Sequence, residues 1–167
     1  MNAPDLRLLL PHDAGHYRGP RAAVWFLVAY TVVATARSLV HILAPDSGAG
    51  SIAGMATAVA GGSNAIALLA QWGGAQLVMA LTASVVLWRY RGLIPLMLAA
   101  ATLDNVLRIL IGLGKPLATA GTPPGALSWL VAPLCAVFLV IALMPGNDPP
   151  RDDDPAAGAQ AGGSVSA

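Results

Sequence analysis

The apolar stretch Leu93 to Leu113 constrains the fold of this chain more than any other segment. It is long enough to cross a bilayer, which takes about 20 residues, yet it contains Asp104 and Arg108. On insertion scales each charge costs roughly 2.5 to 3.5 kcal/mol at the membrane centre, whereas each Leu, Ile or Val returns only about 0.3 to 0.6 kcal/mol. The two charges therefore need compensation. Their i, i+4 spacing places both on one helix face, so they can pair and face protein rather than lipid.

The composition is typical of a membrane protein. Hydrophobic residues make up 56% of the 167 residues and charged residues 10%, whereas a soluble domain is about one quarter charged. The net charge of +1 and the scattered basic residues argue against a nucleic-acid partner, which binds a basic patch. Cys135 is the only cysteine, which excludes an intramolecular disulfide and a thiolate metal cage. The absence of Glu and the preference for Arg over Lys suggest a GC-rich bacterial gene.

Apolar runs bounded by Pro, Gly and charged residues predict an all-α integral membrane four-helix bundle. The predicted transmembrane domain covers residues 21–144, with spans at residues 21–43, 64–88, 93–113 and 126–144. Pro133 predicts a kink in the fourth span. The short connection between the second and third spans predicts that these two helices form an antiparallel hairpin.

The segments outside the spans are polar or rich in small residues. Residues 1–20 lack an apolar run long enough for a signal-peptide core, so the first span is predicted to be an uncleaved anchor. Residues 45–63 are rich in Gly, Ala and Ser, and a plain loop and a short interfacial or re-entrant helix fit them equally well. Residues 145–167 have no hydrophobic periodicity and predict a disordered cytoplasmic tail.

The distribution of basic residues predicts the orientation of the bundle. The basic residues of the N-terminal segment, the second connection and the tail are Arg7, Arg18, Arg21, Arg89, Arg91 and Arg151. The first and third connections contain only Lys115. Because basic residues stay on the cytoplasmic side, we expect a multi-pass protein of the bacterial inner membrane with both termini in the cytoplasm.

In this orientation most intramembrane polar side chains gather in the outer leaflet. The candidate ligand-binding residues are Arg37, His41, Gln71, Asp104, Asn105 and Arg108. At 1.5 Å per residue, Arg37, Gln71 and Arg108 lie within one helical turn of one another in depth. Gln76 is the main polar side chain of the spans that lies outside the outer leaflet. Two arginines and one acid leave a surplus of positive charge. We therefore expect a pocket for a membrane lipid or a small anionic molecule, in a binding or accessory subunit.

Three other interpretations remain open. Asp104 can bridge Arg37 and Arg108 and lock the first helix to the third without any ligand. The Gly and Ala faces of the helices can serve a structural or assembly partner of another membrane protein, in a homo- or hetero-oligomer. A small proton- or ion-coupled transporter could use Asp104, although an acid paired with an arginine is a poor proton carrier.

The sequence predicts no catalytic residue, no cofactor and no metal site, and it argues against an enzyme. Ser38 and Ser128 have no neighbouring His–Asp pair that would indicate a nucleophile. His41 has no second intramembrane histidine with which to hold a haem. His12 and His16 have the i, i+4 spacing of zinc ligands on a helix, but no Cys or Glu supports them.

Several short motifs resemble those of a group of uncharacterised bacterial four-span inner-membrane proteins. These motifs are the run Gln71-Trp72-Gly73-Gly74-Ala75-Gln76-Leu77, then Trp88-Arg89-Tyr90-Arg91, Pro95-Leu96, an acid before Arg108, and Lys115-Pro116 ahead of Pro124-Gly125. The resemblance covers about residues 20 to 145. It implies four spans and carries no established activity.

Overall fold

The computed structural model describes residues 4–121, 123 and 125–144. Every regular element within these residues is a helix, which confirms the all-α prediction. The elements are η1 (Leu6–Leu9), α1 (Arg21–Leu43), α2 (Gly62–Arg89), η2 (Arg91–Leu93), α3 (Ile94–Gly114) and α4 (Ser128–Ala142). The predicted tail, residues 145–167, lies outside the described residues.

Three helical segments are long and apolar enough to cross a membrane: α1, α2, and α3 together with η2. The fourth helix, α4, has 15 residues and a length of about 22 Å, which is shorter than the roughly 30 Å of hydrocarbon in a bilayer. It begins at Ser128 rather than at residue 126, because residues 125–127 form turns and Gly125 has a φ of 92°. The helix continues through Pro133.

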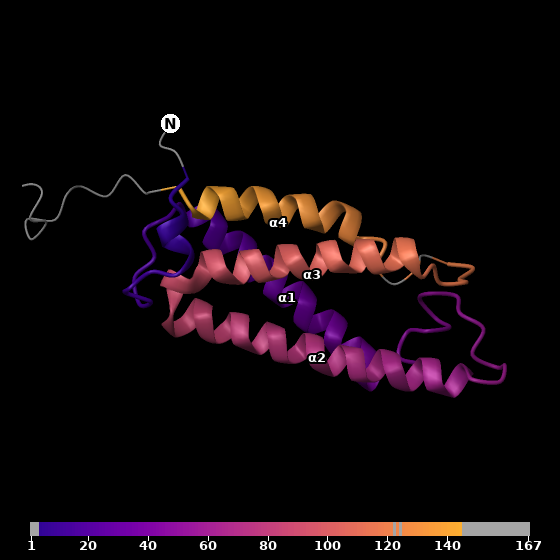
Figure 1. Cartoon of the computed structure of the whole chain (residues 1–167). Helices are drawn as coiled ribbons and strands as arrows, with labels where there is room; N and C mark the ends of the chain where they lie inside the picture. Colours follow the sequence, from indigo (N-terminus) through magenta and orange to yellow (C-terminus); the bar gives the residue numbers. More distant parts are fainter. Residues whose placement is uncertain (1–3, 122, 124, 145–167) are drawn as a thin grey trace, which may run out of the picture.

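The helices associate as two pairs, α1 with α2 and α3 with α4 (Figure 1). A glycine allows the close approach within the first pair: a Cβ at Gly73 would lie 2.6 Å from the Cβ of His41. Ala80, one helical repeat further along α2, is also buried. Small residues on one helix face let two backbones come close, and this face of α2 therefore packs on α1.

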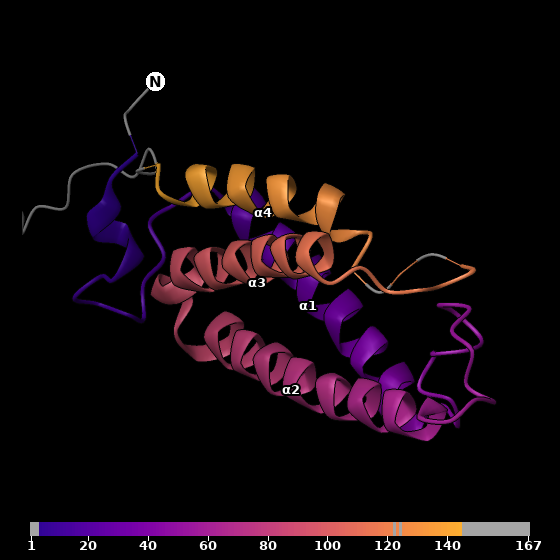
Figure 2. The same cartoon turned by 45° about the vertical axis from the view of Figure 1, so that its right-hand side comes forward.

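The two pairs are held together at the end of the bundle where the N-terminal segment lies, which we call the amino-terminal end. Leu27, Ile94 and Leu98 are almost completely buried there, and the rings of Phe26 and Phe138 stack with centroids 4.1 Å apart. Away from this end α2 diverges from α3 (Figure 2). The short connection reverses the chain direction as predicted, but α2 and α3 make few contacts with each other.

The N-terminal segment folds over the amino-terminal end. The Gly92 amide donates a hydrogen bond to the Ala14 carbonyl at 2.8 Å, and the Asp5 amide donates to the Leu143 carbonyl at 2.9 Å. The segment therefore covers both the α2–α3 connection and the end of α4.

The opposite end, which we call the loop end, is formed by the first and third connections. Residues 44–61 form turns and no helix, so the plain loop is the correct alternative for most of the segment 45–63. The Ala120 amide donates to the Gly54 carbonyl at 3.1 Å, and the Gly121 amide donates to the Ala53 carbonyl at 3.3 Å. We call this pairing of residues 53–54 with residues 120–121 the strap, because it joins the α1–α2 connection to the α3–α4 connection.

Candidate functional site

A cavity of about 300 Å³ lies between the two helix pairs, and all four helices contribute to its lining. Apolar side chains such as Leu27, Met79 and Met97 form one part of it. Polar or amphipathic side chains form the other part, which we call the polar end of the cavity: Tyr30, Arg37, Trp72, Gln76, Asp104, Asn105, Arg108 and Ser128. Ligand pockets measure roughly 300 to 1,000 Å³, so this cavity suits a small or slender molecule.

Arg108 and Asp104 form the ion pair that their i, i+4 spacing predicts. Asp104 Oδ2 accepts from Arg108 Nη2 at 2.7 Å and from Arg108 Nε at 2.9 Å. The Arg108 side chain is 13% exposed and the Asp104 side chain 44% exposed. Among the described residues Asp104 Oδ1 has no hydrogen-bond partner, so the outer face of this carboxylate is available to another group.

Gln76 and Trp72 of α2 complete the surroundings of Arg108. With its amide oxygen turned toward them, Gln76 accepts from Arg108 Nη1 at 3.0 Å, from Arg108 Nη2 at 3.2 Å and from Trp72 Nε1 at 3.2 Å. The Arg108 guanidinium lies 4.5 Å from the centroid of the Trp72 ring, within the range of a cation–π interaction. These contacts connect α2 to α3 across the cavity.

Arg37 lies at the same level but has a different set of partners. Its guanidinium is 5.1 Å from the Trp72 ring centroid, and its Nε is 3.5 Å from His41 Nε2. Among the described residues the ion pairs are His16–Asp13 and Arg108–Asp104, and Arg37 takes part in neither. Asp104 therefore does not bridge the two arginines as the structural alternative required, and the polar end has one positive charge in excess.

His41 is buried behind Arg37 and does not line the cavity. Its Nδ1 lies 2.7 Å from the Ser47 carbonyl oxygen. A carbonyl only accepts, so the hydrogen of a neutral ring is on Nδ1, and Nε2 can accept from Arg37. His41 thus holds Arg37 in position instead of contacting a ligand directly.

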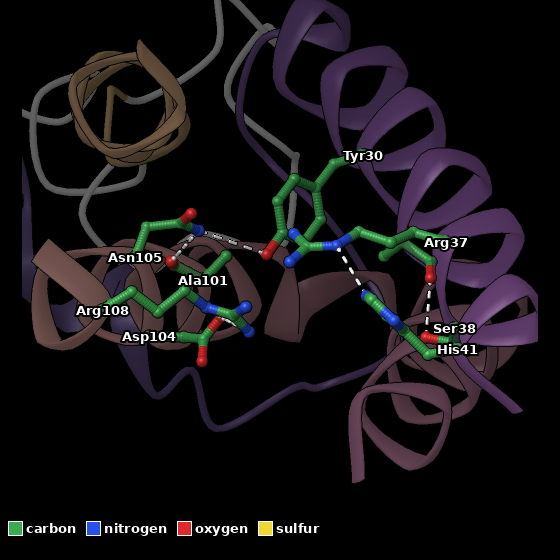
Figure 3. A network of polar contacts seen from close by, with 9 residues as sticks. Tyr30, Arg37, Ser38, His41, Ala101, Asp104, Asn105 and Arg108 are labelled. Atoms are coloured by element: carbon green, nitrogen blue, oxygen red, sulfur yellow. Dashed lines mark hydrogen bonds and ion pairs between the residues drawn. The ribbon is translucent and has the colours of Figure 1, made fainter. Parts of the chain in front are cut away.

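Two more polar side chains, one from α1 and one from α3, line the polar end of the cavity. Tyr30 lies on the same face of α1 as Arg37 and lines the cavity, although it is not among the residues that the sequence assigns to the site. Its hydroxyl oxygen accepts from Asn105 Nδ2 at 3.4 Å. Asn105 also donates to the Ala101 carbonyl at 2.9 Å. Figure 3 shows Tyr30 and Arg37 of α1 opposite Asn105 and Arg108 of α3. The Tyr30 hydroxyl hydrogen has no acceptor among the described residues and can be donated to a ligand.

The positions of the two glutamines of α2 relative to the cavity are the reverse of those expected from the sequence. Gln71 is exposed and lies outside the cavity, whereas Gln76, expected outside the cluster, lines the polar end. Gly73 contacts α1, and Gln71, two residues earlier, is rotated from it by roughly 200°. Gln76 is three residues after Gly73 and on its side of the helix. Its i, i+4 spacing from Trp72 is the sequence signal that could have identified both residues.

The histidines of the N-terminal segment do not form the arrangement that would bind zinc on a helix. Residues 10–19 are not helical, and His16 pairs with Asp13. A hydrogen bond from the Gly15 amide and the contact with His16 lower the pKa of Asp13. Within the described part of the chain no three His, Cys, Asp or Glu residues come together as metal ligands would.

The site therefore brings together Arg37, Asp104, Asn105 and Arg108 and adds Tyr30, Trp72, Gln76 and Ser128, whereas Gln71 and His41 do not line the cavity. The site thus offers the Arg37 guanidinium and the Tyr30 hydroxyl as hydrogen-bond donors beside the apolar part of the cavity. Comparisons of the chain with protein-family models, with curated proteins and with solved structures find no match.

Proposed function

We propose that this protein is a membrane-embedded binding or accessory subunit whose cavity holds a single-chain amphiphile with one negative charge. The observation that carries the proposal is the Arg37 guanidinium, which lines the cavity without an acidic partner among the described residues. A carboxylate or phosphate head group beside Arg37 would balance the excess charge. The apolar lining, including Leu27 and Met97, would contact the hydrocarbon chain.

The geometry of the polar end suits an anion. A guanidinium offers two parallel N–H donors to a carboxylate or phosphate, and such charge-assisted bonds are about twice as strong as neutral ones. Tyr30 adds a hydroxyl that can donate to the same group. Because the cavity is small, one chain rather than the two chains of a phospholipid fits inside it.

We further propose that the chain crosses a bacterial inner membrane four times with both termini in the cytoplasm. The amino-terminal end of the bundle carries Arg18, Arg89 and Arg91, whereas the loop end carries Lys115, and this asymmetry supports the orientation. The short α4 can cross if the bilayer thins locally around it. The resemblance to four-span bacterial proteins agrees with this topology.

Native mass spectrometry of the gently solubilised protein tests the proposal with oleate as the probe and monoolein as its uncharged counterpart. Arg37→Gln should weaken oleate binding by about tenfold to a hundredfold, because a hydrogen bond to a charged group contributes roughly 1.5 to 3 kcal/mol. The matched control is Arg91→Gln, since Arg91 is exposed and lies outside the cavity. Its oleate binding should equal that of the unmodified protein.

The opposite results would refute the proposal. Equal oleate binding by Arg37→Gln and the unmodified protein would show that Arg37 does not recognise the head group. Equal binding of monoolein and oleate would show that charge is not recognised at all. Lysophosphatidate, tested in the same way, distinguishes a phosphate head group from a carboxylate.

A further inference from the structure

The cavity is open toward its sides, where a membrane protein meets lipid. Met79 of α2 is 48% exposed and the Asp104 side chain of α3 is 44% exposed, although both residues line the cavity. Since α2 and α3 make few contacts with each other, the cavity is accessible between these two helices at Met79 and Asp104, and we call this access the α2–α3 opening. On the other flank Val33 of α1 lines the cavity and is also exposed.

The amino-terminal end offers no comparable route. Leu27 and Ile94 are at most 1% exposed, and they belong to the packed core that joins the two helix pairs. The N-terminal segment covers this core through its hydrogen bonds to Gly92 and Leu143. A ligand entering here would have to displace well-packed side chains.

The strap spans the loop end. Its two backbone segments approach each other closely. A Cβ on Gly54 would lie 2.6 Å from the Gly121 nitrogen, and a Cβ on Gly121 would lie 3.1 Å from the Ile52 oxygen. Gly54 also has a φ of 66°, a conformation that favours glycine. The strap thus ties together the two connections between which a ligand from the aqueous side would have to pass.

We infer that the ligand enters from the bilayer through the opening between α2 and α3, and is therefore a membrane-borne amphiphile rather than a water-soluble anion. This inference rests on the proposed function. The α2–α3 flank is favoured over the Val33 flank because α2 and α3 diverge from their connection and make few contacts with each other (Figure 2). Met79 has a flexible side chain that can move aside.

The test uses the protein reconstituted in phosphatidylcholine vesicles with two photoactivatable carboxylic acids. A long-chain diazirine fatty acid partitions into the bilayer, and a short-chain diazirine acid stays in water. Met79→Trp fills the α2–α3 opening and should slow labelling by the long-chain probe by at least about tenfold. Leu81→Trp is the matched control, because Leu81 is exposed on the same helix but does not line the cavity. It should leave the rate unchanged.

A second set of variants examines the other routes. Gly54→Val disrupts the strap and should not change labelling by the long-chain probe. Val33→Trp narrows the cavity from α1 and should slow labelling by the long-chain probe less than Met79→Trp does. Faster labelling in Gly54→Val together with a normal rate in Met79→Trp would place the entrance at the loop end and overturn the inference. Slower labelling in Val33→Trp alone would place the entrance between α1 and α4. Efficient self-crosslinking of Met79→Cys that excludes the probe would show that a second copy covers the opening.

The Arg37 and Met79 variants distinguish failure of the binding site from failure of the proposed entrance. If Arg37→Gln is labelled as well as the unmodified protein, the binding proposal fails, whatever the route. If labelling requires Arg37 but is insensitive to Met79→Trp, the site stands and only the entrance is wrong.

Discussion

His41 Nδ1 lies 2.7 Å from the carbonyl oxygen of Ser47, and this contact links the polar end of the cavity to the first connection. On its other side the ring accepts from Arg37 Nε at 3.5 Å. His41→Phe keeps an aromatic ring near Trp72 but removes both hydrogen bonds. We expect the free energy of unfolding to fall by about 1 to 3 kcal/mol, because the buried Ser47 carbonyl loses its partner.

The same variant should also weaken oleate binding, since Arg37 loses the group that holds it. Thermal unfolding in detergent and native mass spectrometry measure the two effects. A His41→Phe protein that is destabilised but binds oleate normally would show that His41 stabilises the first connection and does not position Arg37.

Asp46 makes the first connection sensitive to acid. Hydrogen bonds from the Ser51 amide, and then from the Gly48 amide and the Ser51 hydroxyl, lower the pKa of Asp46 from 3.8 to about 2. The folded state therefore binds this proton less well than the unfolded state. The stabilisation is complete above about pH 4 and is lost as the pH falls toward 2.

Asp46→Asn should accordingly lower the melting temperature at pH 6 and reduce the further loss between pH 4 and pH 2. Thermal unfolding across this pH range gives the difference curve. Asp13→Asn, in the N-terminal segment, is the control that should retain the contribution of Asp46. A difference curve between the Asp46→Asn and unmodified proteins that stays flat over this range would contradict the assignment.

Gly73 and Gly74 provide a matched pair for testing how α1 and α2 pack. A Cβ at Gly73 would lie 2.6 Å from the Cβ of His41, whereas a Cβ at Gly74 would meet, among the described residues outside its own turn of α2, no heavy atom within 4 Å. Gly73→Ala should destabilise the protein by about 1 to 3 kcal/mol through overpacking. Gly74→Ala should be neutral or stabilising by up to about 1 kcal/mol, because alanine favours the helix. Equal unfolding free energies for the two variants would refute the close α1–α2 contact.

Asp104→Asn separates a ligand site from a purely structural ion pair. Arg108 is 13% exposed and would lose its acidic partner, so we expect a loss of about 1 to 3 kcal/mol in the free energy of unfolding. The polar end would then carry two uncompensated positive charges, and oleate should bind more tightly than to the unmodified protein. Unfolding and oleate titrations on the same preparation measure both. If stability and oleate binding decrease together, the ion pair supports the fold and the cavity does not select anions.

The candidate site could be predicted in part because some of its geometry is local. The i, i+4 spacing alone brings Asp104 and Arg108 together, and helical periodicity places Tyr30 and Arg37 on one face of α1. Gln76 rather than Gln71 lines the cavity, which differs from the expectation, because depth along a helix does not give the direction in which a side chain points. That direction depends on how α2 is rotated against α1.

The positions of the helices and the charged side chains within apolar segments can be predicted from the amino-acid sequence, because both follow from composition and spacing along one chain segment. Three features appear only once the helices are packed: Arg37 has no acidic partner among the described residues, Trp72 lies near both guanidinium groups, and α2 and α3 diverge around a cavity. The physical reason is that these features depend on the rotation and crossing of whole helices. The contact at Gly73 and the packing at the amino-terminal end set that rotation and crossing, and local periodicity does not contain them.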